Sequence, residues 1–282
     1  MTDADSNHLD VLTKPVSRRG ALVLLGGLGL AVAGCSAGND SNRATATTKG
    51  SSSSSTSTTS GATTTTTGTT VSTCSAIPQE TGGPYPGDGT NGPNVLAESG
   101  VVRKDITTSF DGYRGTAEGV PYTISFTVVD IDNGCTPMTG AAVYVWHCDR
   151  EGQYSMYTAS DANYLRGVQQ VDANGVASFT SIFPACYSGR WPHVHFEVYP
   201  TVDDATSGKN KLATSQFALP KDVCETVYAT SGYEQSVSNL SRVSLASDNV
   251  FSDGVSLQTP SMTGNASSGY VSSLVVGVAG SV

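Results

Sequence analysis

The segment PACYSGRWPHVHFEVYP, residues 184–200, contains two of the four histidines of the chain, His193 and His195. From His193 onward it alternates in the manner of a β-strand, so we expect a strand over 193–200. Residues i and i+2 of a strand point to the same face, which puts the two imidazoles side by side, roughly 7 Å apart along the backbone. Such a pair suits one metal ion, but the H-x-H pattern alone equally fits two histidines on a solvated strand face.

Strand patterns also dominate the rest of the chain after residue 120. Runs rich in β-branched and aromatic residues, with turn signals between them, predict strands at 122–131, 141–148, 175–183 and 269–280. Only residues 219–230 have a helical pattern. Short strands with glycine-rich turns, long loops and little helix predict an all-β fold, a single β-sandwich. A barrel remains the alternative.

The first 35 residues have the features of an export signal rather than of a folded domain. A twin arginine, Arg18 and Arg19, precedes a short apolar run that ends in VAGC at Cys35. This ending resembles a lipobox, which predicts lipidation of Cys35 and a lipoprotein on the outer side of the cell membrane. A plain secretory peptide, giving a secreted protein, is the alternative, and the Sec or Tat route stays open.

Residues 36–73 are rich in serine and threonine and carry too little apolar surface to fold, so we expect a disordered linker. Glycosylation of this linker stays open. Residues 74–282 are then one domain of ordinary size. The formal net charge of −9 and the lack of a basic block argue against nucleic-acid binding. Membrane contact is expected only through the N-terminal lipid anchor.

Five cysteines follow Cys35, and their odd number leaves at least one free thiol. An exported chain reaches an oxidising compartment, so we expect one or two disulfides, with the pairing undetermined. No CxxC spacing indicates a zinc ribbon. The five are Cys74, Cys135, Cys148, Cys186 and Cys224.

Two tyrosines are candidates to complete a metal site with the histidine pair. Tyr187 precedes His193 by six residues, and Tyr154 follows the strand predicted at 141–148. Two phenolates and two imidazoles suit a hard ferric ion, which stabilises a phenolate strongly enough to deprotonate it. The alternative is that both are ordinary members of a set of twelve tyrosines.

Four segments together resemble the intradiol ring-cleavage dioxygenases, the family of protocatechuate 3,4-dioxygenase and catechol 1,2-dioxygenase, and above all their exported bacterial relatives. The specific elements are a W-H/Q-x-x-x-x-G-x-Y motif and an R-x-x-H-x-H motif, in this order and spacing. The segments are ETGGPYPGDG (80–89), GAAVYVWHCDREGQYS (140–155), FPACYSGRWPHVHFEV (183–198) and TSQFALP (214–220).

The resemblance assigns a role to each matching position. It implies a non-haem Fe(III) ion held by four metal ligands, of which Tyr187 leaves when substrate binds. Arg190 aligns with an arginine that stabilises negative charge on the substrate ring, and Gln216 with a glutamine of the oxygen and substrate pocket. Tyr85 falls at the pocket edge, and Trp191 replaces a usual proline and could add an aromatic pocket surface. The ligands are Tyr154, Tyr187, His193 and His195.

The implied activity is an oxidoreductase reaction of aromatic compound catabolism. A catechol-type ring is cleaved between its two hydroxylated carbons, and both atoms of O₂ enter a muconate-type diacid. The expected partners are therefore a small aromatic diol and O₂. A non-catalytic extracellular β-sandwich binding module on the same scaffold is the alternative. The identity of the catechol or hydroxyquinol and the oligomeric state stay open.

Overall fold

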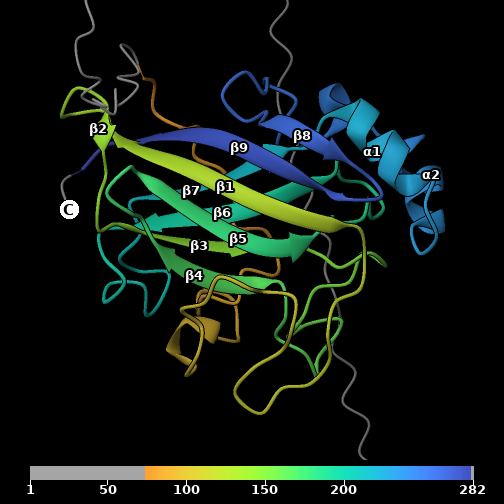
Figure 1. Cartoon of the computed structure of the whole chain (residues 1–282), viewed down its shortest axis with the longest axis horizontal. Helices are drawn as coiled ribbons and strands as arrows, with labels where there is room; N and C mark the ends of the chain where they lie inside the picture. The colour runs from red at the N-terminus through yellow and green to blue at the C-terminus, as the bar shows by residue number, and fades with distance from the viewer. Residues whose placement is uncertain (1–73, 281–282) are drawn as a thin grey trace, which may run out of the picture. The chain divides into compact units, whose positions relative to one another are not determined.

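The computed structural model describes residues 74–280 (Figure 1). The predicted signal peptide (1–35), the lipidation site Cys35 and the predicted linker (36–73) lie outside the described residues. Within them, strands form two sheets and only two α-helices occur. The prediction of an all-β sandwich is confirmed.

The first sheet has five strands in which β1 (Pro121–Asp130) pairs parallel with β9 (Gly269–Val278). The other pairings are antiparallel: β8 (Ser261–Asn265) joins β9, and both β5 (Val176–Ile182) and the short β2 (Thr136–Pro137) join β1. The predicted strands at 122–131, 175–183 and 269–280 are thus β1, β5 and β9.

The second sheet is antiparallel in the order β4-β3-β6-β7 and carries the histidine pair on β6 (His193–Tyr199). It lies behind the first sheet in the view of Figure 1. The strand predicted at 141–148 is β3 (Ala142–Trp146), shorter than expected. Two further strands were not predicted, β4 (Arg166–Gln170) and β7 (Ala213–Ala218).

The core between the sheets is aromatic. Phe126 of β1 contacts Phe179 of β5 from its own sheet and Phe196 and Phe217 of the second sheet, with ring centroids 4.9–6.4 Å apart. All four are fully buried, and each buried side chain of this size contributes roughly 1.5–3 kcal/mol by removal from water. Because Phe196 faces this core, His193 and His195 on the same strand must point to the opposite face of the sheet.

The predicted helix at 219–230 is α1 (Lys221–Tyr228). A second helix, α2 (Glu234–Leu240), corrects the expectation that only one helical stretch exists. Its inward residues include Ser236 and Asn239, so it lacks the apolar stripe that marks a helix in sequence. Two short 3₁₀ helices span Val95–Ala97 and Leu245–Ser247.

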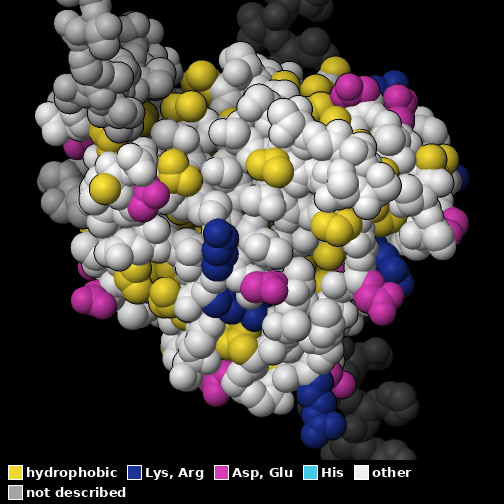
Figure 2. Space-filling model, viewed as in Figure 1, with side chains coloured by type: hydrophobic (Ala, Val, Ile, Leu, Met, Phe, Trp, Pro, Cys, Tyr) yellow, Lys and Arg dark blue, Asp and Glu magenta, His cyan; other side chains and the backbone are white. Residues whose placement is uncertain are grey.

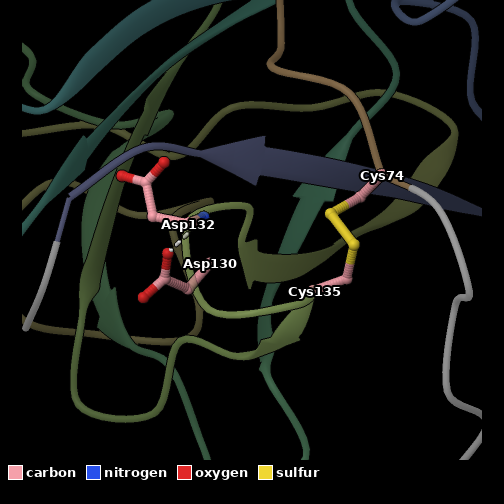
Figure 3. Close-up of a disulfide and its surroundings, with 4 residues drawn as sticks. All are labelled: Cys74, Asp130, Asp132 and Cys135. Carbon is pink, nitrogen blue, oxygen red and sulfur yellow. Dashed lines mark hydrogen bonds between the residues drawn. A yellow bond between two sulfur atoms is a disulfide. The ribbon is translucent and has the colours of Figure 1, made fainter.

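One disulfide is present among the described residues, between Cys74 and Cys135 (Figure 3). It ties the start of the described chain to the turn after β1, across a sequence separation of 61 residues. Cys148, Cys186 and Cys224 are free and buried. The expectation of one or two disulfides with at least one free thiol is therefore confirmed.

Charged side chains are sparse on the face shown in Figure 2, and basic groups there lie close to acidic ones rather than forming a continuous positive patch. The surface over β1, β9 and β8 in that view is mostly uncharged. In the part of the chain that the structure describes, no helix is long and apolar enough to cross a membrane.

Candidate metal centre

Three of the four predicted ligand side chains converge on an imidazole nitrogen of the fourth, His193. The Nε2 atom of His193 lies 3.0 Å from Nε2 of His195, 3.2 Å from the Tyr187 hydroxyl and 3.4 Å from the Tyr154 hydroxyl. Tyr154 comes from a position 39 residues before His193, so the chain must fold back to bring it there. The structure thus gathers two nitrogen and two oxygen donors at one point.

The strand β6 and its neighbours fix the two imidazoles. His195 stacks on Trp146 of β3, its register partner, with planes only 7° apart and centroids at 4.8 Å. Nδ1 of His193 lies 2.5 Å from the carbonyl oxygen of Trp191, which can only accept. Nδ1 of His193 must therefore carry the proton, and its Nε2 keeps a free lone pair directed at the other donors.

Two glycines allow the donors to approach so closely. Gly152, in the G-x-Y motif, has a φ of +84°, and a Cβ there would lie 3.0 Å from Cβ of Tyr187. Gly83 has a φ of +69°, and a Cβ there would lie 3.3 Å from Cε1 of His195. Both positions combine left-handed backbone with a tight contact, so glycine is needed for the Tyr187 loop and for the His195 pocket.

Helix α2 holds the loop that carries Tyr187. The backbone N–H of Cys186 donates to the Ser236 hydroxyl at 3.0 Å, and the Asn239 amide donates to the Cys186 carbonyl at 2.8 Å. The polar inner face of α2 thus forms hydrogen bonds with both backbone groups of Cys186, the residue before Tyr187. These bonds fix the loop from which the Tyr187 phenol projects.

Burial perturbs all four donors. It lowers the pKa of His193 to about 3, with a further decrease from the nearby charge of Arg190. Burial, then the neighbouring His193 and Arg190, holds the pKa of His195 well below its usual range. Burial raises the pKa of Tyr187 to about 12 and that of Tyr154 well above its usual range. Without a metal, the cluster is therefore neutral, and its phenols can ionise only against a strong positive charge.

The donor set fits a ferric ion. Among the described residues, no three or more His, Cys, Asp and Glu side chains lie together as a metal site. The two histidines therefore need the two tyrosine phenols to complete a set of four donors. Such a set, with nitrogen lone pairs and hard oxygens but no thiolate or carboxylate, suits trivalent iron rather than a zinc or calcium site. The residues that would hold it are Tyr154, Tyr187, His193 and His195.

A cavity of about 550 Å³ opens beside the donors, and both tyrosines line it. Tyr85 also lines it, with its ring 4.9 Å from that of Tyr154. Among the lining residues, Arg190 alone carries a charge. The rest of the lining is uncharged: Thr81, Gly83, Pro84, Gly152, Thr158, Ser188 and Asn249.

Arg190 and Gln216, both predicted to border the substrate pocket, are in direct contact. Arg190 Nη2 donates to Gln216 Oε1 at 2.8 Å, and Gln216 Nε2 donates to the carbonyl of Thr81 at 2.7 Å. Gln216 lies opposite His195 in the β6–β7 register. These two partners also settle which end of the Gln216 amide faces Arg190.

Trp191 is placed differently from the other predicted site residues. It is buried, and its indole N–H donates to the carbonyl of Leu219 at 2.9 Å. It does not line the cavity beside the donors. It lines a second, mainly apolar cavity of about 880 Å³ bordered by α1, α2 and residues 243–246.

Sequence analysis missed two charged residues beside the site. Asp248 accepts a hydrogen bond from Arg190 Nε at 2.9 Å. Arg166, which is fully buried, donates to the carbonyls of Tyr85 and Ser155, so one guanidinium joins the cavity edge to the loop of Tyr154. Neither residue has a distinctive motif, because each acts through partners that are distant in sequence.

The fold of this domain has counterparts among known proteins. A family model described as Dioxygenase matches residues 90–204, which include all four donors and Arg190. An intradiol ring-cleavage dioxygenase from Tetranychus urticae has a TM-score of 0.57 and 23% identity, covering 73% of this chain and 95% of that one. The dioxygenase domain of a carbohydrate-binding fusion protein from Streptomyces sp. SirexAA-E has a TM-score of 0.48 and 20% identity, covering 73% and 99%. No curated protein matches the sequence significantly.

The family model thus covers residues 90–204, the part of the chain that carries the four candidate donors. The described part of the chain has the fold of the intradiol ring-cleavage enzymes, and the resemblance that the sequence indicates is confirmed.

Proposed function

We propose that the protein is a non-haem ferric dioxygenase that cleaves catechol-type rings between the two hydroxylated carbons, with O₂ as co-substrate. The observation that carries the proposal is that two phenol oxygens and the Nε2 atom of His195 lie within 3.4 Å of His193 Nε2, at the edge of a cavity. A ferric ion held there would act as a Lewis acid and as a template for both catechol oxygens.

The chain's own residues would prepare the reaction. Tyr187 lies in a half-buried loop between the donors and the cavity, and burial raises the pKa of its phenol to about 12. If a bound ferric ion had deprotonated this phenol, the resulting phenolate would be basic enough to accept a proton from a catechol hydroxyl. Tyr85 and Tyr154, on one wall of the cavity, offer aromatic surface to a planar ring and exclude water from it.

Arg190 would stabilise the negative charge that builds on the ring as its hydroxyls deprotonate. Its guanidinium is fixed before substrate binds, so no reorganisation is needed during the reaction. Replacing Arg190 by Gln should lower kcat on the order of 10²–10³-fold, as loss of a comparable fixed donor does. Iron content should not change, since Arg190 provides no ligand.

The cavity favours catechols without an acidic side chain. Its only charged lining residue, Arg190, is already paired with Asp248, and no second cation lines the cavity to receive a carboxylate. Catechol and hydroxyquinols should therefore be better substrates than protocatechuate.

The test is oxygen uptake by iron-loaded protein against a panel of neutral and carboxylated catechols, with the product identified by mass. A ring-opened diacid containing two atoms from ¹⁸O₂ supports the proposal. Protein that takes up no iron, stays colourless and consumes no oxygen with any catechol overturns it in favour of a non-catalytic binding module.

Export to the outer face of the membrane is also a proposal, because it depends on residues 1–35. Radiolabelled palmitate incorporation by the full chain, compared with Cys35→Ala, tests it. Equal labelling of both chains would exclude lipidation at Cys35.

A further inference from the structure

Asp248, directly after the 3₁₀ helix Leu245–Ser247, has a fully buried carboxylate that accepts four hydrogen bonds. Its Oδ2 accepts from Arg190 Nε at 2.9 Å and from the backbone N–H of Trp191 at 2.6 Å. Its Oδ1 accepts from the backbone N–H groups of Val250 at 2.8 Å and Phe251 at 3.2 Å. Both oxygens are therefore used, and one of them is dedicated to Arg190 and the residue that follows it.

Arg190 is held at two points of its planar fork. Nε donates to Asp248, and Nη2 donates to Gln216 at 2.8 Å. Nη1 makes no hydrogen bond to any other residue in the range 74–280, and the side chain lines the cavity beside the metal donors. Because a guanidinium is rigid and planar, two fixed points set the direction of its free N–H groups.

The ion pair between Arg190 and Asp248 lies away from solvent, so removing one partner would leave the other charge buried and unpaired. Exposure of the side chains is 13% for Arg190 and 0% for Asp248. Burial raises the pKa of Asp248, but the hydrogen bonds from Arg190 and the backbone N–H groups outweigh this and lower it overall. The carboxylate is thus ionised at neutral pH, and removing its charge would leave Arg190 without its anionic partner.

The partners of this pair come from distant parts of the chain. Gln216 belongs to β7, and its amide donates to Thr81 in the segment before β1. Asp248 therefore stands at the end of a hydrogen-bond chain, Asp248–Arg190–Gln216–Thr81, that borders the cavity. Only the Arg190 and Thr81 members line the cavity itself.

We propose that Asp248 is a positioning residue, which acts through Arg190 by directing the free edge of its guanidinium at the substrate ring. This inference rests on the proposed function, in which Arg190 stabilises charge on that ring. Asp248 makes no hydrogen bond to a metal donor and does not line the cavity. Its one side-chain partner is Arg190, so we expect its effect on catalysis to pass through Arg190. Unchanged iron content would exclude the other route, in which Asp248 acts through Trp191 on His193.

The first variant is Asp248→Asn, which keeps the shape of the side chain and one carbonyl acceptor but removes the charge. We expect iron content and the visible absorption of the tyrosinate–iron centre to stay as in the wild type. We expect kcat to fall roughly 10- to 100-fold, as a misplacement of about 1 Å does, with little change in KM. The matched control, Asp253→Asn, makes the same charge change at an exposed residue five positions further and should leave kcat unchanged.

A double-mutant cycle separates positioning from a purely structural role. In an Arg190→Gln background, Asp248→Asn should cost less than twofold in kcat, because the group that it positions is gone. Equal losses in both backgrounds would overturn the inference. If Asp248→Asn lowers the yield of folded protein, Asp248→Ser replaces it, since a serine hydroxyl still caps the N–H groups of Val250 and Phe251 but is too short to hold Arg190.

A crystal structure of the metal-free Asp248→Asn protein gives a readout that is independent of activity. We expect the Arg190 guanidinium to leave Gln216 and turn away from the cavity. An unmoved guanidinium together with unchanged kcat would refute the positioning role. Wild-type protein that binds iron but cleaves no catechol would instead refute the proposed function, and a displaced Arg190 in the variant structure would still support the structural half of this inference.

Discussion

The Nε2 atoms of His193 and His195 lie 3.0 Å apart, directed at each other from neighbouring positions on one face of β6. Two neutral imidazoles at this distance share at most one proton between the facing nitrogens. Nδ1 of His195 has no hydrogen-bond partner among the described residues. It is therefore free to carry the proton when Nε2 binds a metal.

Removing one imidazole should remove the metal. For His195→Ala we expect loss of iron affinity on the order of 100-fold or more, since even indirect partners of ligands are worth 10- to 100-fold. Tyr187→Phe should keep part of the iron with altered colour and poor turnover. Iron content and visible spectra are the measurements, and His147→Gln, a buried histidine outside the cluster, is the control. Full iron and activity in His195→Ala would show that the ligand assignment is wrong.

Gly83→Ala should weaken metal binding through its contact with His195. The left-handed backbone at Gly83 makes alanine cost about 1 kcal/mol, and the new Cβ would lie 3.3 Å from Cε1 of His195. Gly112→Ala is a matched control, because Gly112 has a φ of +86° with no atom within 4 Å of an added Cβ. Both variants should lose similar unfolding free energy in urea, but only Gly83→Ala should lose iron affinity in a chelator competition. Equal iron affinity in the two would contradict the contact.

The metal-free protein should lose stability as the pH falls from 6.5 towards 4. Burial lowers the pKa of His147 to about 4, and its ring bonds to Ser181 and the Cys148 carbonyl. The unfolded chain binds a proton near pH 6.5 and the folded one does not, so stability rises with pH across this window. His147 alone should account for about 2 kcal/mol between pH 7.5 and pH 5.

Urea unfolding of the wild type and of His147→Gln at both pH values measures this contribution. The variant should retain the part of the pH dependence that comes from His193 and His195, whose pKa values are also depressed by burial. Its loss of stability at pH 5 should be smaller by about 2 kcal/mol. Identical pH profiles for the two proteins would contradict the buried neutral state of His147.

The Cys74–Cys135 disulfide should stabilise the domain without affecting the metal centre. It closes a loop with a sequence separation of 61, which is worth about 4 kcal/mol in the chain-entropy account. Cys135 follows β1 in the five-stranded sheet, whereas the histidines lie in the other sheet. The double variant Cys74→Ser, Cys135→Ser should unfold at lower urea concentration and bind iron normally.

Mild reduction of the wild type is the control for this variant, because the other described cysteines are already free thiols. The reduced protein and the double variant should have the same unfolding midpoint. A midpoint unchanged from the oxidised wild type in both would show that the disulfide does not contribute to stability.

Local patterns in the sequence predicted most of the strands, and the family resemblance implied the four candidate donors. The alternation over 193–200 predicts β6 and places both imidazoles on one face, because side-chain direction in a strand depends only on neighbouring residues. Strands β4 and β7 were missed because they are buried on both faces over most of their length and show no clear alternation. Helix α2 was missed because its inward face is polar.

What the sequence alone could not decide is which distant residues meet. Tyr154 and Tyr187 reach His193 only after two loops close against each other at Gly152, and Asp248 reaches Arg190 across 58 residues. Such contacts depend on the packing of the sheets and helices around the loops, and no local propensity encodes them. The sequence by itself determined which side chains are available as donors and the strand that carries two of them, and the tertiary structure decided that all four candidate donors converge beside one cavity.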